Sequence, residues 1–242
     1  MLLNCDLGES FGSWKMGEDA LAMPHIDLAN IACGFHGGDP LVMQRTLALA
    51  KEHKVTVGAH PSYPDRQGFG RRSMALSHDE LLTDIHYQIA ALSGMAQVQG
   101  LNIEYVKPHG ALYNDMMRDD AVLNTVLDAI STYPSELKLM MLATTHSHEH
   151  RVLAQAKGVE LLLEAFADRR YTDAGNLTPR SQQGSVLNKQ QMLSQVHSLV
   201  NQGVVITDTG KTLPLEADTL CVHGDNLAGI AAIKEIRALC MP

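Results

Sequence analysis

The sequence predicts an α/β fold, specifically a single irregular, seven-stranded (β/α) barrel that spans residues 1–242. Three observations support this prediction. Seven apolar, strand-like runs alternate with helical patterns, which is the order of a parallel sheet with right-handed crossovers. Most of the runs are continuously apolar, as expected for strands that are covered on both faces. Ionisable residues end nearly every run.

The strand-like runs lie at residues 2–6, 28–35, 55–60, 103–107, 138–144, 159–165 and 219–223. Helical patterns fall between them at residues 40–53, 78–99, 119–131, 147–157, 189–202 and 226–240. Asp39 is placed to cap the first helix, and Ser77 has the capping-box partner Glu80 three residues later. Residues 204–213 predict an added hairpin around Thr209-Gly210.

A doubly wound open sheet is the alternative architecture for such a series of units. An open sheet concentrates its binding site at one switch point, where the strand order reverses. Here potential site residues end nearly every strand, and all strand ends of a barrel meet at one mouth. This distribution favours the barrel.

Composition limits the possible partners and the location. The chain has a formal net charge of -8 and 45% hydrophobic residues, without a Lys/Arg cluster long enough to bind nucleic acid. Aromatic residues are only 5%, so we expect a core of Leu, Ile, Val, Ala and Met. The four cysteines form no CxxC pair and are expected to be reduced core thiols. We find no membrane-span or signal-peptide pattern, and expect a cytoplasmic protein with no membrane partner.

Histidines and acids mark the ends of the strand-like runs. Four runs end in a histidine followed by glycine or proline, namely His36, His60, His109 and His223. Two other segments end in acids, namely Asp6 near the start and Glu164 with Asp168 later. Because the carboxyl ends of parallel strands meet at one mouth of a barrel, these titratable groups should converge. The pattern therefore predicts an enzyme.

We call the end of a strand-like run together with the turn that follows it a corner. The first three corners offer a general base and a possible metal site. Asp6 could act as a general base, bind a metal or anchor a cation, while Glu9 is equally compatible with function and with hydrogen-bonding loop amides. His36 and His60 could bind zinc together with Asp6, since neutral imidazole and carboxylate are zinc ligands. A lone histidine is more often a satisfied structural residue, so a divalent metal at this site stays an open alternative.

The fourth corner has the residues best suited to a reaction. Lys107 ends an apolar strand, where a lysine has a desolvation cost unless it meets an anion. It could hold a substrate carboxylate or phosphoryl group while His109 donates or accepts a proton. The structural alternative is a buried ion pair between Lys107 and Glu164 or Asp6.

The long loop at residues 61–72 carries Arg66, Arg71 and Arg72, which are candidate anchors for a carboxylate or a phosphate. For Arg71 we prefer surface solvation. Two other patterns are discounted. The alternating histidines at residues 146–150 do not share a helix face, and Gly210-Lys211-Thr212 lacks the first glycine of a phosphate-binding loop.

Taken together, the corner segments resemble the LamB/YcsF family. The resemblance covers almost the whole chain and rests on residues 4–9, 29–36, 58–66, 106–110, 164–169 and 221–225. Any one segment is weak evidence, but six in order are highly specific. The resemblance implies a barrel related to the glycoside hydrolase/deacetylase fold.

The same resemblance implies a hydrolase that acts on a cyclic amide. The implied reaction is ATP-dependent cleavage of 5-oxo-L-proline to L-glutamate, with ADP and phosphate, performed together with 5-oxoprolinase subunits B and C. ATP would be a co-substrate bound mainly by the partner subunits, in keeping with the discounted nucleotide motif. Two alternatives stay open: a stand-alone metal-dependent deacetylase or amidohydrolase, and a non-catalytic structural subunit.

On this hypothesis the strand-end residues divide into two groups. The expected catalytic residues are Asp6, Lys107 and His109, with Asp6 or His109 handling the proton of water. The expected substrate-binding residues are His36, His60, Arg66, Glu164, Asp168 and His223, with Lys107 or Arg66 on an anionic group.

Overall fold

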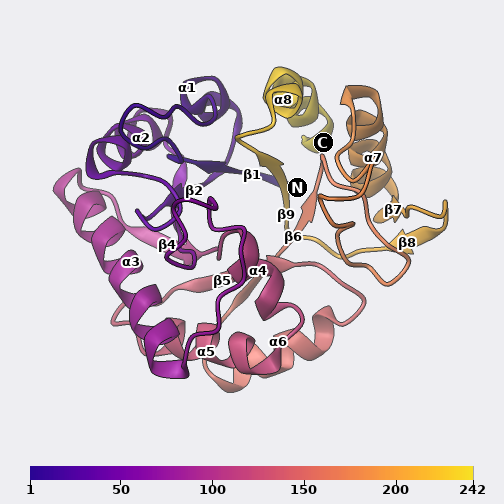
Figure 1. Ribbon diagram of the computed structural model, residues 1–242. Helices are drawn as coiled ribbons and strands as arrows, with labels where there is room; N and C mark the ends of the chain where they lie inside the picture. The colour runs from indigo at the N-terminus through magenta and orange to yellow at the C-terminus, as the bar shows by residue number, and fades with distance from the viewer. Residues whose placement is uncertain (242) are drawn as a thin grey trace.

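The computed structural model describes residues 1–241 and confirms the seven-stranded barrel. The strands are β1 (Leu2–Leu7), β2 (Leu28–Ala32), β3 (Thr56–His60), β4 (Ile103–Val106), β5 (Lys138–Leu142), β6 (Leu161–Phe166) and β9 (Thr219–His223). They pair in parallel in this order, and β9 closes the barrel by pairing with both β6 and β1. Figure 1 shows the helices arranged around the strands. Closure excludes the open sheet.

The six predicted helices are present, with ends within one residue of the expected ones. They are α2 (Pro40–His53), α3 (His78–Val98), α5 (Asp120–Ser131), α6 (Ser147–Ala156), α7 (Lys189–Gln202) and α8 (Leu227–Cys240). Asp39 accepts hydrogen bonds from the first-turn amides of α2, and Ser77 forms the predicted capping box with Glu80 at the start of α3. Asp119 and Asn226 act as caps rather than first helical residues.

Three short helices were not predicted. They are α1 (Asp19–Ala22), the 3₁₀ helix η1 (Met23–His25) and α4 (Gly110–Met116). Each is too short to show a helical repeat of apolar residues. The omission of α4 matters most, because it starts directly after His109 and fixes the direction in which the chain leaves the fourth corner.

The predicted hairpin is also present, as β7 (Val204–Ile206) paired antiparallel with β8 (Thr212–Pro214). In its turn, Lys211 Nζ lies 2.6 Å from Asp173 Oδ2, and Thr209 donates to the same carboxylate. Lys211 therefore belongs to a surface ion pair, which agrees with discounting a phosphate-binding loop.

The interior of the protein has two regions that differ in polarity. The space between strands and helices holds aliphatic side chains, as the composition predicts, for example Leu47, Ile89 and Val126. The interior of the barrel toward the carboxyl ends of the strands is instead polar, with several buried amide and charged side chains. A Cβ at Gly58 would lie 2.2 Å from the ring of Tyr105, so glycine is needed there for the tyrosine to fill the barrel.

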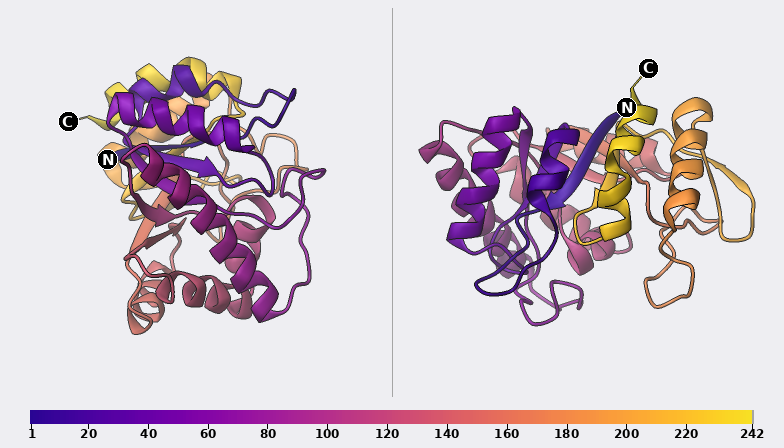
Figure 2. Two further views of the ribbon diagram at one scale, coloured as in Figure 1. Left: turned by 90° about the vertical axis from the view of Figure 1, so that its left-hand side faces the viewer. Right: turned by 90° about the horizontal axis from the view of Figure 1, so that it is seen from above.

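The loops that follow the strands gather at one end of the barrel. In the right-hand view of Figure 2, the loops after β1, β3 and β6 project on the side opposite the two chain ends. The strand-end residues therefore face a common mouth, as in other (β/α) barrels. Within residues 1–241, no helix has the length and apolar character needed to cross a membrane.

Candidate functional site

A cavity of about 520 Å³ opens at this mouth. Five of the nine predicted site residues line it, namely Asp6, His60, Lys107, His109 and His223. Its outer wall adds Arg71, Arg169 and Arg180, and Phe166 contributes an aromatic face. The cavity thus has titratable side chains at its bottom and positively charged side chains around its entrance.

Lys107 forms the buried ion pairs that were the structural alternative to substrate binding. Its Nζ lies 2.8 Å from Asp6 Oδ1 and 3.0 Å from Glu164 Oε2, and all three side chains are buried. Burial opposes the charged ammonium, but Asp6 and Glu164 outweigh it and raise the pKa of Lys107 well above its ordinary value. Lys107 still lines the cavity, so the ion pair shapes the site rather than replacing it.

A row of polar side chains holds Asp6 in place. Asn30 donates to Asp6 Oδ1 at 2.7 Å and to Asn4 Oδ1 at 2.8 Å, and Tyr105 donates to Asn30 at 2.7 Å. Burial would raise the pKa of Asp6, but Lys107 and then His60 hold it well below its usual range. Asp6 is therefore an ionised carboxylate in a fixed position.

Asn4 and Asn30 were not singled out in the sequence. A signal was nevertheless present, because an asparagine inside an otherwise apolar, buried strand needs a hydrogen-bond partner there. Register places Asn30 beside Asp6 on the neighbouring strand.

Glu9 and three histidines form a second cluster beside Asp6. Oε1 of Glu9 lies 3.2 Å from His36 Nε2 and 3.3 Å from His109 Nδ1, and His109 Nδ1 lies 3.0 Å from His60 Nε2. Burial, followed by the charge of Asp6, raises the pKa of Glu9 well above its ordinary value. Burial also lowers the pKa values of His36 and His109, so their neutral forms are favoured.

These four residues could hold a metal ion, because their ligand atoms all lie within 4.8 Å of one another. The set differs from the one expected from the sequence. His36 and His60 belong to it, but Glu9 takes the place of Asp6, whose Oδ1 is engaged by Lys107 and Asn30. Glu9 reaches the cluster because the chain turns sharply at Gly8, which has a φ of 68°.

The ends of β6 and β9 are joined by a separate polar contact. His223 Nδ1 lies 2.9 Å from Asp168 Oδ1, and Asn226 donates to Asp168 Oδ2 at 2.8 Å. Burial raises the pKa of Asp168, but His223 outweighs it and the net direction is downward. Asp168 thus orients His223, whose ring stacks on Phe166 at the cavity wall.

Arg66 is the one predicted site residue that the structure does not place with the other eight at the mouth of the barrel. Its side chain is exposed, donates to the carbonyl of Gly34 at 2.7 Å and lies over the ring of Phe11. Arg71 is exposed, as we expected, with 41% of its side chain accessible; it also reaches the cavity rim, where it lies 2.6 Å from Asp225.

Arg169 is a cation of the site that was not among the nine predicted site residues, although it belongs to the segment of residues 164–169 that supplied Glu164 and Asp168. It is 7% exposed and lines the cavity, where it donates to the carbonyls of Thr178 and Ser185. Among residues 1–241 it forms no ion pair with a carboxylate. Burial, and then the charge of Arg180, lowers its pKa to about 10. An anion at this point would stabilise the buried guanidinium.

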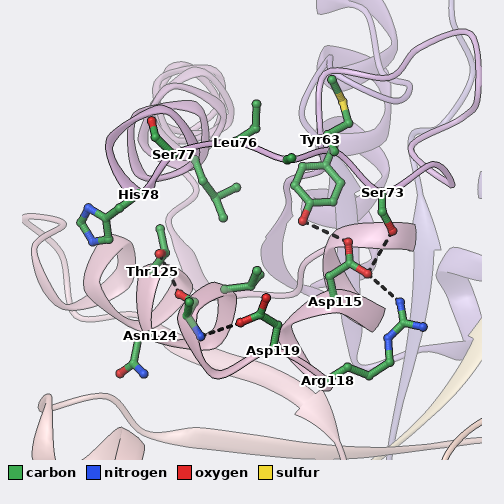
Figure 3. A pocket seen from close by; sticks show the side chains of 15 residues that line it. Tyr63, Ser73, Leu76, Ser77, His78, Asp115, Arg118, Asp119, Asn124 and Thr125 are labelled. Carbon is green, nitrogen blue, oxygen red and sulfur yellow. Dashed lines mark hydrogen bonds and ion pairs between the residues drawn. The ribbon is translucent and has the colours of Figure 1, made fainter.

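A larger cavity, of about 820 Å³, lies outside the barrel near the start of α3. Figure 3 shows its polar groups turned toward one another: Asp115 accepts hydrogen bonds from Tyr63, Ser73 and Arg118. Because these groups already satisfy each other, the smaller cavity at the mouth is the better candidate site. The discounted histidines also lie elsewhere, with His146 and His148 exposed.

Comparisons with known proteins agree with this picture. The model of the LamB/YcsF family matches residues 1–241. A Pseudomonas putida protein, named as an A subunit of 5-oxoprolinase, is 53% identical over 238 residues, which cover 98% of this chain and 92% of the relative. A Vibrio cholerae protein, also named as the A subunit of 5-oxoprolinase, is 52% identical over 237 residues, with 98% and 96% covered.

A solved structure extends the agreement to three dimensions. The crystal structure of the lactam utilization protein from Thermus thermophilus superimposes with a TM-score of 0.89 at 39% identity. The match covers 99% of this chain and 95% of the other. The family expected from the corner segments is thereby confirmed, and this chain belongs to the LamB/YcsF family.

Proposed function

We propose that this chain is the lactam-binding subunit of a 5-oxoprolinase. Together with subunits B and C, it would couple ATP hydrolysis to the opening of 5-oxo-L-proline, giving L-glutamate, ADP and phosphate. The names of relatives that are about half identical over nearly the whole chain support this reaction. ATP would be bound mainly by the partner subunits.

The observation that carries the proposal is the pairing of two kinds of group across one cavity. The buried Asp6–Lys107 pair lies at its base, and Arg169, which lacks a carboxylate partner within residues 1–241, lies in its wall. 5-Oxo-L-proline carries one carboxylate and one lactam. Arg169 would bind the carboxylate through charge-assisted hydrogen bonds, which directs the lactam toward Asp6 and Lys107.

The chemistry follows from the stability of the five-membered lactam. Phosphorylation of the lactam oxygen by ATP would make its carbon electrophilic. Water would then add to that carbon, and cleavage of the C–N bond would release the amine and leave the new carboxyl group as an acyl phosphate. A second water would hydrolyse this acyl phosphate to give glutamate and phosphate. Lys107 would stabilise the negative charge that develops on oxygen, as a preorganised cation in a site shielded from water.

Asp6 is the better placed of the two candidate bases for the water proton. Its carboxylate is ionised and faces the cavity. His109 is less suited, because its Nε2 donates to the carbonyl of Phe69 and its Nδ1 faces His60. His60, His109 and His223 would instead form the wall around the lactam.

The direct test is an assay for 5-oxoproline-dependent formation of ADP and glutamate. We expect none from this chain alone, none from subunits B and C alone, and equal amounts of both products from the assembled complex. Glutamate formation by this chain without ATP would favour the stand-alone amidohydrolase. Full turnover by subunits B and C without this chain would contradict the proposal.

Replacing Arg169 by methionine should raise the KM for 5-oxoproline about 10- to 150-fold, which corresponds to the loss of about 1.5–3 kcal/mol from a charged hydrogen bond. The R169K variant should have a KM for 5-oxoproline between those of the unchanged chain and R169M. Arg170 provides the matched control: it donates to the carbonyl of Gly184 in the same loop but does not line the cavity. If R170M raises KM as much as R169M, loop damage rather than lost recognition would be the cause.

A further inference from the structure

The cluster of Glu9, His36, His60 and His109 has more hydrogen-bond acceptors than donors. His60 Nδ1 lies 2.6 Å from the carbonyl oxygen of Lys107, and His109 Nε2 lies 2.9 Å from that of Phe69. A carbonyl oxygen can only accept, so each of these nitrogens carries the ring proton. In the neutral form of either ring, the other nitrogen is then an unprotonated acceptor.

These two acceptors face each other. His60 Nε2 and His109 Nδ1 are 3.0 Å apart, and neither can donate to the other in the neutral rings. Oε1 of Glu9 adds a third electron-rich atom, 3.3 Å from His109 Nδ1 and 4.0 Å from His60 Nε2. Three lone-pair-bearing atoms thus point into one buried space, and a positive species between them would stabilise the arrangement.

His36 adds a fourth atom to the same space. Its Nε2 lies 3.2 Å from Glu9 Oε1, while its buried Nδ1 has no hydrogen-bond partner among residues 1–241. One additional proton could satisfy only one of these contacts. A cation that accepts several ligands at once would satisfy all of them.

We propose that Glu9, His36, His60 and His109 bind one divalent transition-metal ion. The neighbouring ligand atoms are 3.0–4.0 Å apart in the four measured pairs. A tetrahedral ion with bonds of about 2.0–2.1 Å separates its ligand atoms by about 3.3 Å, so the spacing fits. Three imidazoles and one carboxylate favour zinc or a neighbouring first-row metal over magnesium or calcium, which prefer oxygen.

The surroundings support the same assignment. The backbone carbonyls at Lys107 and Phe69 fix the tautomers of His60 and His109, which is the usual outer-shell arrangement of ligating histidines. The rings of His36 and His109 stack with their centroids 3.7 Å apart, so binding must tilt them until both lone pairs meet the ion. Since His60 and His109 also line the cavity, the ion would lie next to the space assigned to the lactam.

The metal site depends on the geometry of the four side chains and not on the proposed reaction. The test uses the full chain, stripped with a chelator and then titrated with Zn²⁺, Mn²⁺ or Mg²⁺ in separate calorimetric experiments without substrate. We expect one Zn²⁺ per chain, weaker Mn²⁺ binding, no Mg²⁺ binding and a higher Tm with Zn²⁺. H36Q should weaken Zn²⁺ binding at least about 100-fold, because it removes a direct ligand.

The exposed His148 supplies a matched control, because H148Q removes a histidine that lies outside the cluster. Affinity lost in H148Q but kept in H36Q would overturn the inference and indicate surface binding. The Co²⁺-loaded native chain gives a measurement that does not rely on a variant, since its visible spectrum should show bound nitrogen ligands. A chain that binds no transition metal but supports glutamate formation would overturn the metal site alone. A chain that binds Zn²⁺ but supports no turnover with its partners would overturn the proposed function alone.

Discussion

Replacing Lys107 by methionine should abolish turnover of the assembled complex and lower the free energy of unfolding of this chain by about 3–5 kcal/mol. Methionine keeps most of the side-chain volume but removes the ammonium between Asp6 and Glu164. Two buried carboxylates are then left without a cation, and a buried unpaired charge is strongly destabilising. Turnover is lost because the charge that would stabilise the lactam oxygen is gone.

The control for this variant is Lys138 at the start of β5. Its Nζ lies 2.6 Å from Glu160 Oε1, but both side chains are largely exposed, so K138M should change the unfolding free energy by less than about 1 kcal/mol. Urea unfolding and the coupled assay measure the two effects separately. An unchanged unfolding free energy in K107M would show that the buried ion pair does not contribute to stability.

A double variant separates the structural from the chemical role of Lys107. Adding E164Q to K107M removes one of the two unpaired charges and should restore part of the lost stability, with a coupling of about 0.5–3 kcal/mol. Turnover should stay absent. Recovery of turnover together with stability would mean that Lys107 acts only by supporting the fold.

The architecture could be predicted because each strand is covered on both faces and the six longer helices carry local signals in the sequence. The continuous apolar runs at residues 138–144 and 219–223 and the caps Asp39 and Ser77 depend only on neighbouring residues. The helix α4 could not be predicted in this way, because seven residues give too little periodicity to distinguish a helix from a loop.

The candidate site was partly predictable for a geometric reason. Residues at the ends of parallel strands must meet, so Asp6, His60 and His223 could be grouped without knowing any loop path. Residues on loops carry no such constraint. Arg66 turns away to Gly34 and Phe11, whereas Arg169 folds back over the cavity, and only the tertiary structure distinguishes them.

The structure also separates two roles that the sequence left combined. Asp6 and the histidines were expected to share one site, either for a metal or for the substrate. Instead Asp6 is committed to Lys107 and Asn30, while Glu9 joins His36 and His109. The two groups meet at His60, whose Nε2 lies 3.5 Å from Asp6 Oδ2 and 4.0 Å from Glu9 Oε1. His60 therefore lies between the proposed reaction centre and the proposed metal site.

Replacing Asp6 by asparagine should lower kcat of the assembled complex about 10²- to 10⁴-fold, which is the usual contribution of a positioned general base. The asparagine can still accept a hydrogen bond from Lys107, and Glu164 still balances its charge, so the unfolding free energy should fall less than in K107M. KM for 5-oxoproline should change little, because the substrate carboxylate is assigned to Arg169.

Asp27 provides the matched control for this prediction. It precedes β2 at the opposite end of the barrel, where it accepts hydrogen bonds from the backbone of Leu3 and from Arg237. D27N should therefore weaken the fold and leave kcat per folded chain unchanged. If D6N and D27N reduce turnover only in proportion to the folded fraction, Asp6 supports the barrel and the base must be another group. A selective loss of kcat in D6N would instead assign the water proton to the carboxylate at the end of β1.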